Sequence, residues 1–180
     1  MIRPTKLLAL VSTVLLLGAC ALLPVQERSA PDFNFLNSVA DVRPSEVIYM
    51  DDDQLSRLKL PALPYQGTNV DVQLIYQGSA PQVRLEQFMS ASRPSCSVVQ
   101  PPASLEGYGN ALRCGRPAGG QPLTEVTLRP NQAVPMHLEG AVLDQGLRAG
   151  TLYIGLRILE GQQRLYDRVD MTQIRIRTRL

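Results

Sequence analysis

The chain has 180 residues, of which 44% are hydrophobic, and a formal net charge of +2. This length supports one domain with a hydrophobic core of its own and is too short for two comfortable ones. A single histidine and three cysteines are too few ligands for a zinc site, and we expect no metal and no cofactor.

The N-terminal segment has the parts of an export signal in the correct order. Arg3 and Lys6 supply positive charge, an apolar run extends from residue 7 to residue 17, and the small pair Gly18-Ala19 precedes Cys20. An ordinary export signal places no special demand on the residue after the cleavage site. A cysteine there therefore adds information that the apolar run alone does not carry.

The stretch Leu17-Gly18-Ala19-Cys20 resembles the lipobox of bacterial lipoproteins, and the resemblance is confined to this N-terminal region. It implies that a signal peptidase recognises Leu17, Gly18 and Ala19. It also implies that Cys20 becomes the N-terminus and carries a diacylglyceryl group and fatty acid such as palmitate. The alternative is an uncleaved transmembrane helix, but the apolar run is at the lower limit of the roughly 20 residues that span a bilayer, and Pro24 ends it.

This resemblance divides the chain into a signal peptide at residues 1–19, a flexible tether at 20–32 and a single domain at 33–180. The proline-containing, polar composition of the tether favours extended chain. Two of the 18 basic residues and none of the 16 acidic ones precede Cys20, so the chain that begins there has no formal net charge. A neutral domain gives no reason to expect nucleic acid as a partner.

The first elements predicted after the tether are short. Phe33 and Phe35 are expected to be the first residues that dock on the fold, and residues 47–50 form a β-prone run. The three aspartates at 51–53 favour a solvated turn or a helix N-cap, because the spaced ligands and the glycine of a calcium loop are absent. Leucines and prolines within residues 58–64 indicate an edge segment.

Alternation of apolar and polar residues then predicts longer strands. Residues 70–76 have the period of a half-buried strand, with Val70, Val72, Leu74 and Tyr76 on one face. Residues 83–89 fit a strand that runs into irregular chain, and a short helix is the alternative. Both segments indicate a β-rich domain.

Cys96 and Cys114 remain as a pair if Cys20 is lipidated, and an even pair in an exported domain predicts a disulfide. Proline and glycine make the enclosed loop expensive to order by packing alone, and the cross-link would contribute roughly 3 kcal/mol on the chain-entropy model. The alternative, a cysteine-based metal or nucleophilic site, lacks supporting ligands nearby in the sequence.

The β-signal strengthens towards the C-terminus. Residues 123–128 and 134–139 alternate, with His137 on the face opposite the apolar one, and residues 143–147 indicate a turn or a single helical turn. Residues 152–158 form the best strand, in which Gly155 would let a neighbouring group approach closely. Residues 161–163 are predicted to close a hairpin that returns along the last strand.

The last strand alternates strictly, with Ile174 and Ile176 inward and Arg175, Arg177 and Arg179 outward. These three arginines form a candidate basic stripe that could contact phosphate groups. The alternative is a guarded edge or solvent face, on which acidic residues of the paired strand neutralise the arginines.

Many short strands separated by proline and glycine turns predict an all-β fold. We expect a two-sheet antiparallel sandwich of immunoglobulin-like or other Greek-key form, with a small β-barrel as the alternative. The absence of tryptophan removes the buried residue of true antibody domains, so that any likeness to them is architectural.

The sequence gives little support for catalysis, and we expect no catalytic residue. His137 has no serine in a Gly-x-Ser-x-Gly elbow as companion, and no phosphate-binding loop is present. The leading hypothesis is a lipid-anchored cell-envelope protein that acts as a non-catalytic binding or assembly module. The alternatives are a small-ligand carrier, which requires an apolar interior cavity, and an envelope hydrolase.

The expected partners are the membrane, through the N-terminal lipid, and an envelope protein or cell-wall component. The domain is expected outside the cytoplasm. Ala21 stands where many lipoproteins of two-membrane bacteria carry an aspartate that retains them at the inner membrane. The resemblance therefore implies the outer membrane in a cell that sorts by this rule.

Overall fold

The computed structural model describes residues 25–56, 64–105, 108–115 and 118–179. The lipobox-like residues Leu17, Gly18, Ala19 and Cys20 lie outside these ranges, as does most of the proposed edge segment at 58–64. In the part of the chain that is described, no helix is long and apolar enough to cross a bilayer.

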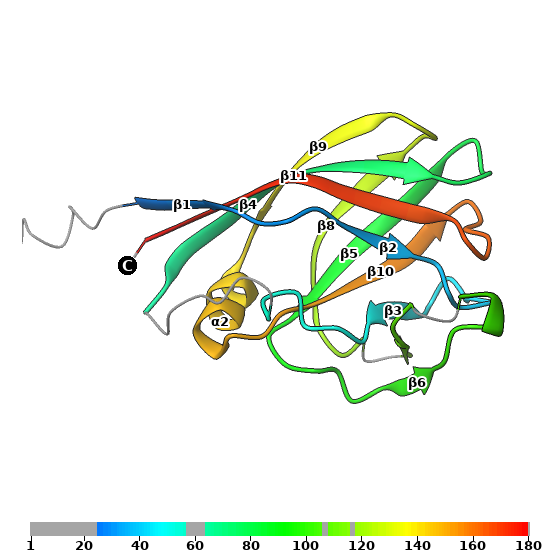
Figure 1. Ribbon diagram of the computed structural model, residues 1–180, viewed down its shortest axis with the longest axis horizontal. Coiled ribbons are helices and arrows are strands. Elements are labelled where there is room, and N and C mark those ends of the chain that lie inside the picture. The colour runs from blue at the N-terminus through cyan, green and yellow to red at the C-terminus, as the bar shows by residue number, and fades with distance from the viewer. Residues whose placement is uncertain (1–24, 57–63, 106–107, 116–117, 180) are drawn as a thin grey trace, which may run out of the picture.

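The described strands form two separate antiparallel sheets, so the predicted sandwich is confirmed over the barrel alternative (Figure 1). In sheet I, β1 (Val25–Ser29) and β2 (Phe33–Leu36) pair one after the other along the same side of β11 (Arg168–Arg179). β4 (Gln66–Gln77) pairs with the other side of β11, and β9 (Ala133–Glu139) pairs with β4.

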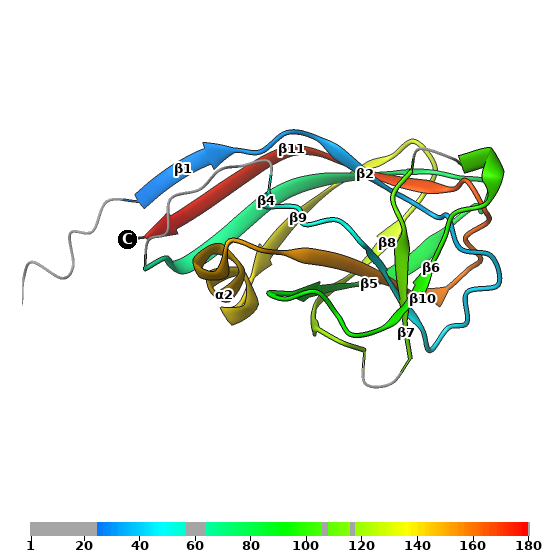
Figure 2. The same ribbon diagram turned by 60° about the horizontal axis from the view of Figure 1, so that its bottom comes forward.

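Sheet II has six strands, of which the outermost on one side is very short. In spatial order these are β6 (Ser97–Val99), β7 (Ala111–Cys114), β3 (Val47–Met50), β10 (Tyr153–Glu160), β5 (Val83–Ser90) and β8 (Gln121–Leu128). A helix, α2 (Ala141–Ala149), lies at the end of the sandwich where β1 begins, and a 3-10 turn spans Ala103–Leu105 (Figure 2).

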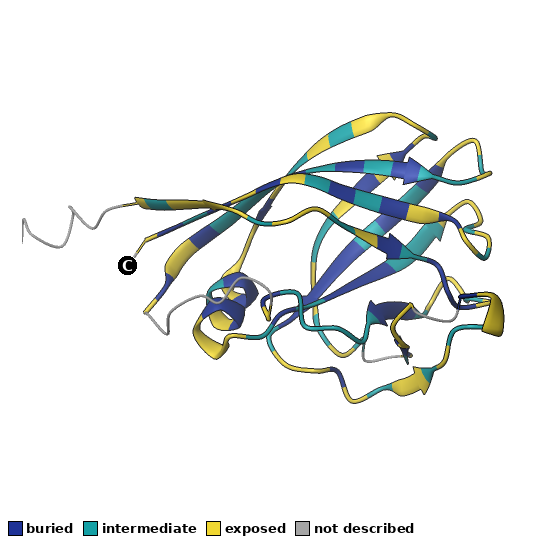
Figure 3. Ribbon diagram, viewed as in Figure 1, coloured by how far each residue is buried: buried dark blue, intermediate teal, exposed yellow. Residues whose placement is uncertain are grey.

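The predicted alternation decides which side chains enter the core. Leu74 and Tyr76 of β4 are buried, whereas His137 on the neighbouring strand β9 is exposed on the outer face, as predicted. Residues 83–90 form a strand and not a helix, and their inward row packs against the inward rows of sheet I. The main core therefore lies between the two sheets (Figure 3).

A second, smaller apolar cluster lies on the outer face of sheet II. Its buried members are Val47, Tyr49, Phe88, Leu112 and Cys114. Gly155 is the cross-strand neighbour of Tyr49, and a Cβ atom added to Gly155 would lie 2.8 Å from ring carbons of Tyr49. The close approach predicted for Gly155 is confirmed, since the tyrosine ring occupies the space that a side chain would need.

The predicted hairpin at residues 161–163 is wrong, because β10 belongs to sheet II and β11 to sheet I. The connecting segment crosses between the sheets and is held by a buried polar network. The Tyr76 hydroxyl donates to the Asp167 carboxylate at 2.6 Å, and the Asn37 amide donates to the Arg164 carbonyl oxygen at 2.9 Å. Burial and this bond to Asp167 raise the pKa of Tyr76 to about 12.

The flexible tether predicted for residues 20–32 is also wrong over residues 25–29, which form β1. Val25 to Ser29 pair with Arg179 to Arg175 of β11 in antiparallel register. The composition of these residues favours extended chain. An extended segment can satisfy its backbone N–H and C=O groups by pairing with a strand that has an unpaired edge. The long strand β11 supplies such an edge.

The turn predicted within residues 143–147 is longer than expected. Helix α2 covers Ala141–Ala149, and Gly150 ends it in the left-handed conformation with a φ of 72°. Its Asp144 carboxylate accepts hydrogen bonds from the backbone N–H groups of Gly67 and Thr68, at 3.1 and 2.8 Å. The helix thereby fixes the start of β4.

Candidate binding surfaces

The predicted disulfide between Cys96 and Cys114 is confirmed, with the two α-carbons 5.0 Å apart. Cys114 ends β7 within the outer cluster of sheet II, and Cys96 packs against that cluster. A Cβ atom on Gly120 would lie 2.4 Å from the Tyr49 hydroxyl oxygen, so the chain after Cys114 lies directly on this ring. Burial raises the pKa of the Tyr49 hydroxyl. The disulfide and the segment that follows Cys114 therefore cover part of the outer face of sheet II.

The rim of this cover is closed by a charged contact. Arg157 of β10 forms an ion pair with Glu86 of β5, and its guanidinium carbon lies 5.2 Å from the centre of the Phe88 ring. A cation over an aromatic face shields apolar surface and keeps its own charge paired. The outer face of sheet II is thus built for packing.

The candidate basic stripe lies on the outer face of sheet I, where acidic residues interrupt it. Arg177 contacts Glu27 of β1 at 3.0 Å and Asp71 of β4 at 3.1 Å. Asp71 also bonds the His137 Nδ1 atom at 2.7 Å. The hydrogen bond with His137, together with the nearby Arg177, lowers the pKa of Asp71. This arrangement matches the guarded solvent face that was the alternative to a phosphate site.

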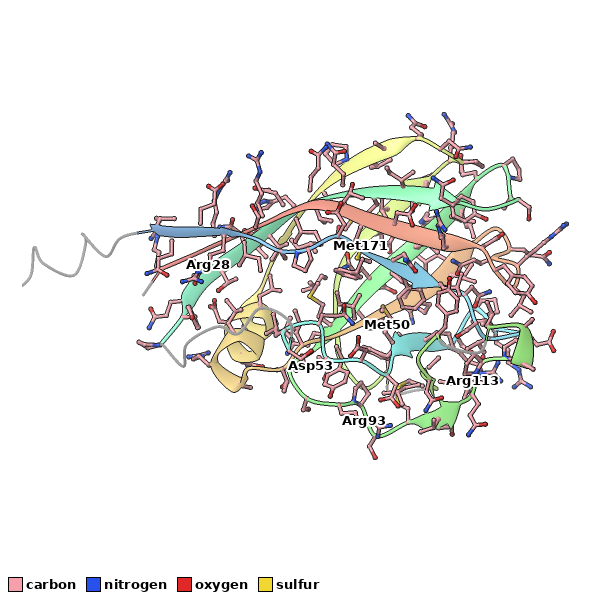
Figure 4. All side chains as sticks on the ribbon, in the orientation of Figure 1. Arg28, Met50, Asp53, Arg93, Arg113 and Met171 are labelled. Atoms are coloured by element: carbon pink, nitrogen blue, oxygen red, sulfur yellow. A yellow bond between two sulfur atoms is a disulfide. The ribbon has the colours of Figure 1, made fainter. Side chains whose placement is uncertain are left out.

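The triple aspartate forms a turn, as predicted. Asp53 accepts hydrogen bonds from the N–H groups of Leu55 and Leu152, at 3.0 and 2.8 Å. Asp51 holds Arg93 through two contacts of 2.6 and 2.8 Å (Figure 4). Among the described residues, no group of three or more His, Cys, Asp or Glu side chains is placed to hold a metal ion.

An open cleft of about 430 Å³, here called the edge cleft, lies between β2 of sheet I and β3 of sheet II. It exists because sheet II continues through β7 and β6 on the side where sheet I ends at β2. Its floor includes Ile48, Met50 and Ala111, and the half-exposed Tyr108 stands beside it. Asp32, Asp51 and Asp52 also line it, and no described lining residue is basic.

β2 differs from the other outer strands of the two sheets. β9 contains Pro135, β8 contains Pro122, β6 has three residues, and β1 carries Arg28 on the inward side beside Ile176. Proline, short length and inward charge all discourage further strand pairing. In the described structure β2 pairs with β11 only, and it contains no proline and no charged residue, although its four residues make it nearly as short as β6. Its free backbone edge borders the edge cleft.

A small cavity of about 60 Å³, here called the core cavity, lies between the sheets. Gln87 of β5 lines it, is 1% exposed, and has no hydrogen-bond partner among the described residues for its side-chain oxygen or nitrogen. An unpaired buried polar group costs roughly 1–3 kcal/mol. The cavity is larger than the roughly 10–15 Å³ that one water needs and far below the roughly 300–1,000 Å³ of ordinary ligand pockets.

A third space, the end groove, lies beside α2 at the end of the sandwich where β1 begins. It has a volume of about 250 Å³. Leu147, Ile176 and Tyr65 give it an apolar wall, and Arg28 stands among its lining residues (Figure 4). The edge cleft and the end groove each share lining residues with the core cavity: Phe33 and Gln54 for the cleft, Ile176 for the groove.

The fold and these surfaces define an antiparallel β-sandwich in which a disulfide and the segment after it cover part of one outer face. No protein-family model matches the chain, and no curated protein sequence matches it. Sequence reasoning missed both the edge cleft and Gln87. The cleft depends on which strands end a sheet, which no local pattern encodes. Gln87 was readable, because it interrupts an alternating row between Leu85 and Met89.

Proposed function

We propose that this protein is a lipid-anchored module of the bacterial cell envelope that binds or assembles with an envelope protein and has no catalysis of its own. The observation that carries the proposal is the free edge of β2 beside the edge cleft. Proteins commonly bind extended partner segments by adding them as a strand to such an edge. The proposed occupant is an extended segment of an envelope protein.

The chemistry of the edge cleft limits that segment. Its backbone would bond β2, and alternate apolar side chains would contact Ile48 and Met50 on the floor of the cleft. Asp32 lines the cleft, and no described lining residue is basic, which favours a segment that carries basic side chains. The half-exposed ring of Tyr108 offers a π-face to such a cation.

The lipobox-like stretch supports a membrane position for this module. Cys20 precedes β1 by five residues, which span at most roughly 18 Å when fully extended. A lipid on Cys20 would therefore hold the β1 end of the sandwich close to the bilayer. The edge cleft lies beyond that end, beside β2 and β3, and would remain open to a partner (Figure 1). Tethering raises the effective concentration of the cleft towards other membrane components.

The anchor is tested by replacing Cys20 with serine. In cells fed a labelled fatty acid, the wild-type chain is expected to carry label and sediment with membranes, and Cys20→Ser to do neither. The thiol accepts the lipid, and a hydroxyl cannot replace it in that reaction. Label or membrane retention that survives the substitution contradicts the anchor.

Docking at β2 is tested by photo-crosslinking in intact cells. Probes at Asn34 and Leu36, which share the outward face of β2, should capture one envelope protein, with crosslinked residues two positions apart along a single segment. A probe at the exposed Gln121 of β8 is the matched control and should not capture that protein. Capture from Gln121 as well, or crosslinks without a two-residue spacing, contradicts strand addition.

The small-ligand carrier stays the second candidate. It requires an apolar interior cavity, and the core cavity is apolar apart from its glutamines. At about 60 Å³ it is too small to enclose the whole of a typical carried ligand. An envelope hydrolase is the third candidate, favoured if the purified protein turns over an envelope substrate.

A further inference from the structure

Gln87 occupies a position that the rest of β5 gives to apolar side chains. Val83, Leu85 and Met89 share its inward face and are almost completely buried. Gln87 is itself 1% exposed, and both polar atoms of its side chain lack a hydrogen-bond partner. An amide in the middle of a sandwich core breaks the local pattern, and such breaks concentrate at functional sites.

The walls around this amide are apolar. Met171 and Ile174 of β11 and Leu143 of α2 belong to the lining of the core cavity, together with aliphatic residues of β4 and β10. The other polar lining residue is Gln54, whose Nε2 atom donates to the Asp52 carbonyl oxygen at 3.0 Å. No described lining residue carries a charge. Within these walls the unsatisfied hydrogen-bonding groups belong to Gln87.

These walls determine what can fill the cavity. A buried water needs two to four polar partners, which this lining offers at Gln87 and poorly elsewhere. An ion would be left without a counter-charge. A carboxamide side chain has a donor and an acceptor next to one another, and a second amide or a hydroxyl group can satisfy both. The apolar walls require that the remainder of the molecule is aliphatic.

We propose that the core cavity is a binding site for a small uncharged amphiphile, a molecule of a few non-hydrogen atoms whose amide or hydroxyl group bonds Gln87 and whose aliphatic part packs on Met171 and Leu143. The ligand enters from the edge cleft, since the two spaces share Phe33 and Gln54 as lining residues. The site does not depend on a partner segment at β2.

The methionines of the chain allow a direct test with the full-length protein in lipid nanodiscs. Met89 and Met171 line the core cavity, whereas Met136 lies on β9 and Met50 lines the edge cleft. With ¹³C-labelled methionine methyl groups and acetamide as the probe, saturable shifts are expected at the Met89 and Met171 signals, while the Met136 signal stays unchanged. Acetate at neutral pH has the same size and a charge, and should produce no such shift.

Gln87→Leu tests the role of the amide, and Gln73→Leu on the outer face of β4 is its matched control. Acetamide should bind at least tenfold more weakly to Gln87→Leu than to the wild-type chain, and with unchanged affinity to Gln73→Leu. The proposal is overturned if the Met89 and Met171 signals do not respond, which indicates water only, or if acetate shifts them equally. Should Gln87→Leu not fold, the comparison of acetamide with acetate on the wild-type chain decides the question.

Discussion

The outer faces of the two sheets differ in what covers them. On sheet II, Val47 and Tyr49 of β3 are completely buried in the outer cluster, which the disulfide and the segment after Cys114 cover. Ile48 between them is buried in the main core. On sheet I, β11 alternates between buried isoleucines and solvent-facing arginines, of which Arg177 is paired with acidic neighbours. A strand covered on both sides loses its alternation, while a strand with one open side keeps it.

The difference between the two outer faces also bears on where a partner is expected to bind. The covered face of sheet II is stabilised by packing and a cross-link, and the open face of sheet I by exposed ion pairs that water competes for. The side chains on both faces are largely engaged in these contacts. The free backbone of β2 lies between them, at the side where sheet I ends and sheet II continues. Binding is therefore expected at this edge.

The largest effect is expected from removing the disulfide. Replacing both Cys96 and Cys114 with alanine should lower the free energy of unfolding by about 3 kcal/mol, because the loop regains freedom in the unfolded chain. The urea midpoint of the double variant, compared with the wild-type chain, measures this. A change below about 0.5 kcal/mol, the range of ordinary surface substitutions, would show that the cover is held by packing alone.

A smaller loss of stability is expected from filling the space beside the Tyr49 ring within sheet II. Gly155→Val places methyl groups against the Tyr49 ring, where even a Cβ atom would lie at 2.8 Å, and should destabilise by about 1–3 kcal/mol. Gly109→Ala is the control, since nothing lies within 4 Å of a Cβ atom there. Equal stability of the two variants in thermal unfolding would contradict the packing described for Tyr49.

The smallest effect is expected on the open face. Asp71→Asn removes the negative charge that His137 and Arg177 contact and leaves an amide oxygen as an acceptor. Exposed pairs of this kind contribute little to stability, and less at high salt. The folded-state pKa of Asp71 is lowered, so its contribution is present above the unfolded value of roughly 3.9 and disappears as the pH falls through the folded value. Unfolding measured at neutral and at acidic pH should therefore show the two proteins converging in acid. A difference that grows in acid would contradict this sign.

The sequence predicted what local alternation determines. The inward rows of β4 and β11, the outward His137 and the close approach at Gly155 were all readable, because a strand with one buried face repeats every two residues. The disulfide was readable from the even pair of cysteines. These features need no knowledge of which strands are neighbours.

The remaining features depend on neighbours far away in the chain. Residues 25–29 carry no alternation, and they form β1 because β11 offers an open edge. The segment after Gly161 crosses to sheet I instead of closing a hairpin, held by the Tyr76 and Asp167 contact across 91 positions of sequence. The edge cleft follows from strand order alone. The local sequence pattern determines which side chains of a strand face the core. The pairing of distant strands determines where a sheet edge stays unpaired and where the edge cleft lies.

Hydrogen exchange of the β2 amides in native membranes tests the central claim most directly. Exchange at residues 33–36 should be slower in isolated envelope membranes than in the purified protein in nanodiscs, while exchange across β8 stays the same in both. Equal exchange at β2 in the two preparations would contradict docking of a partner segment at this edge.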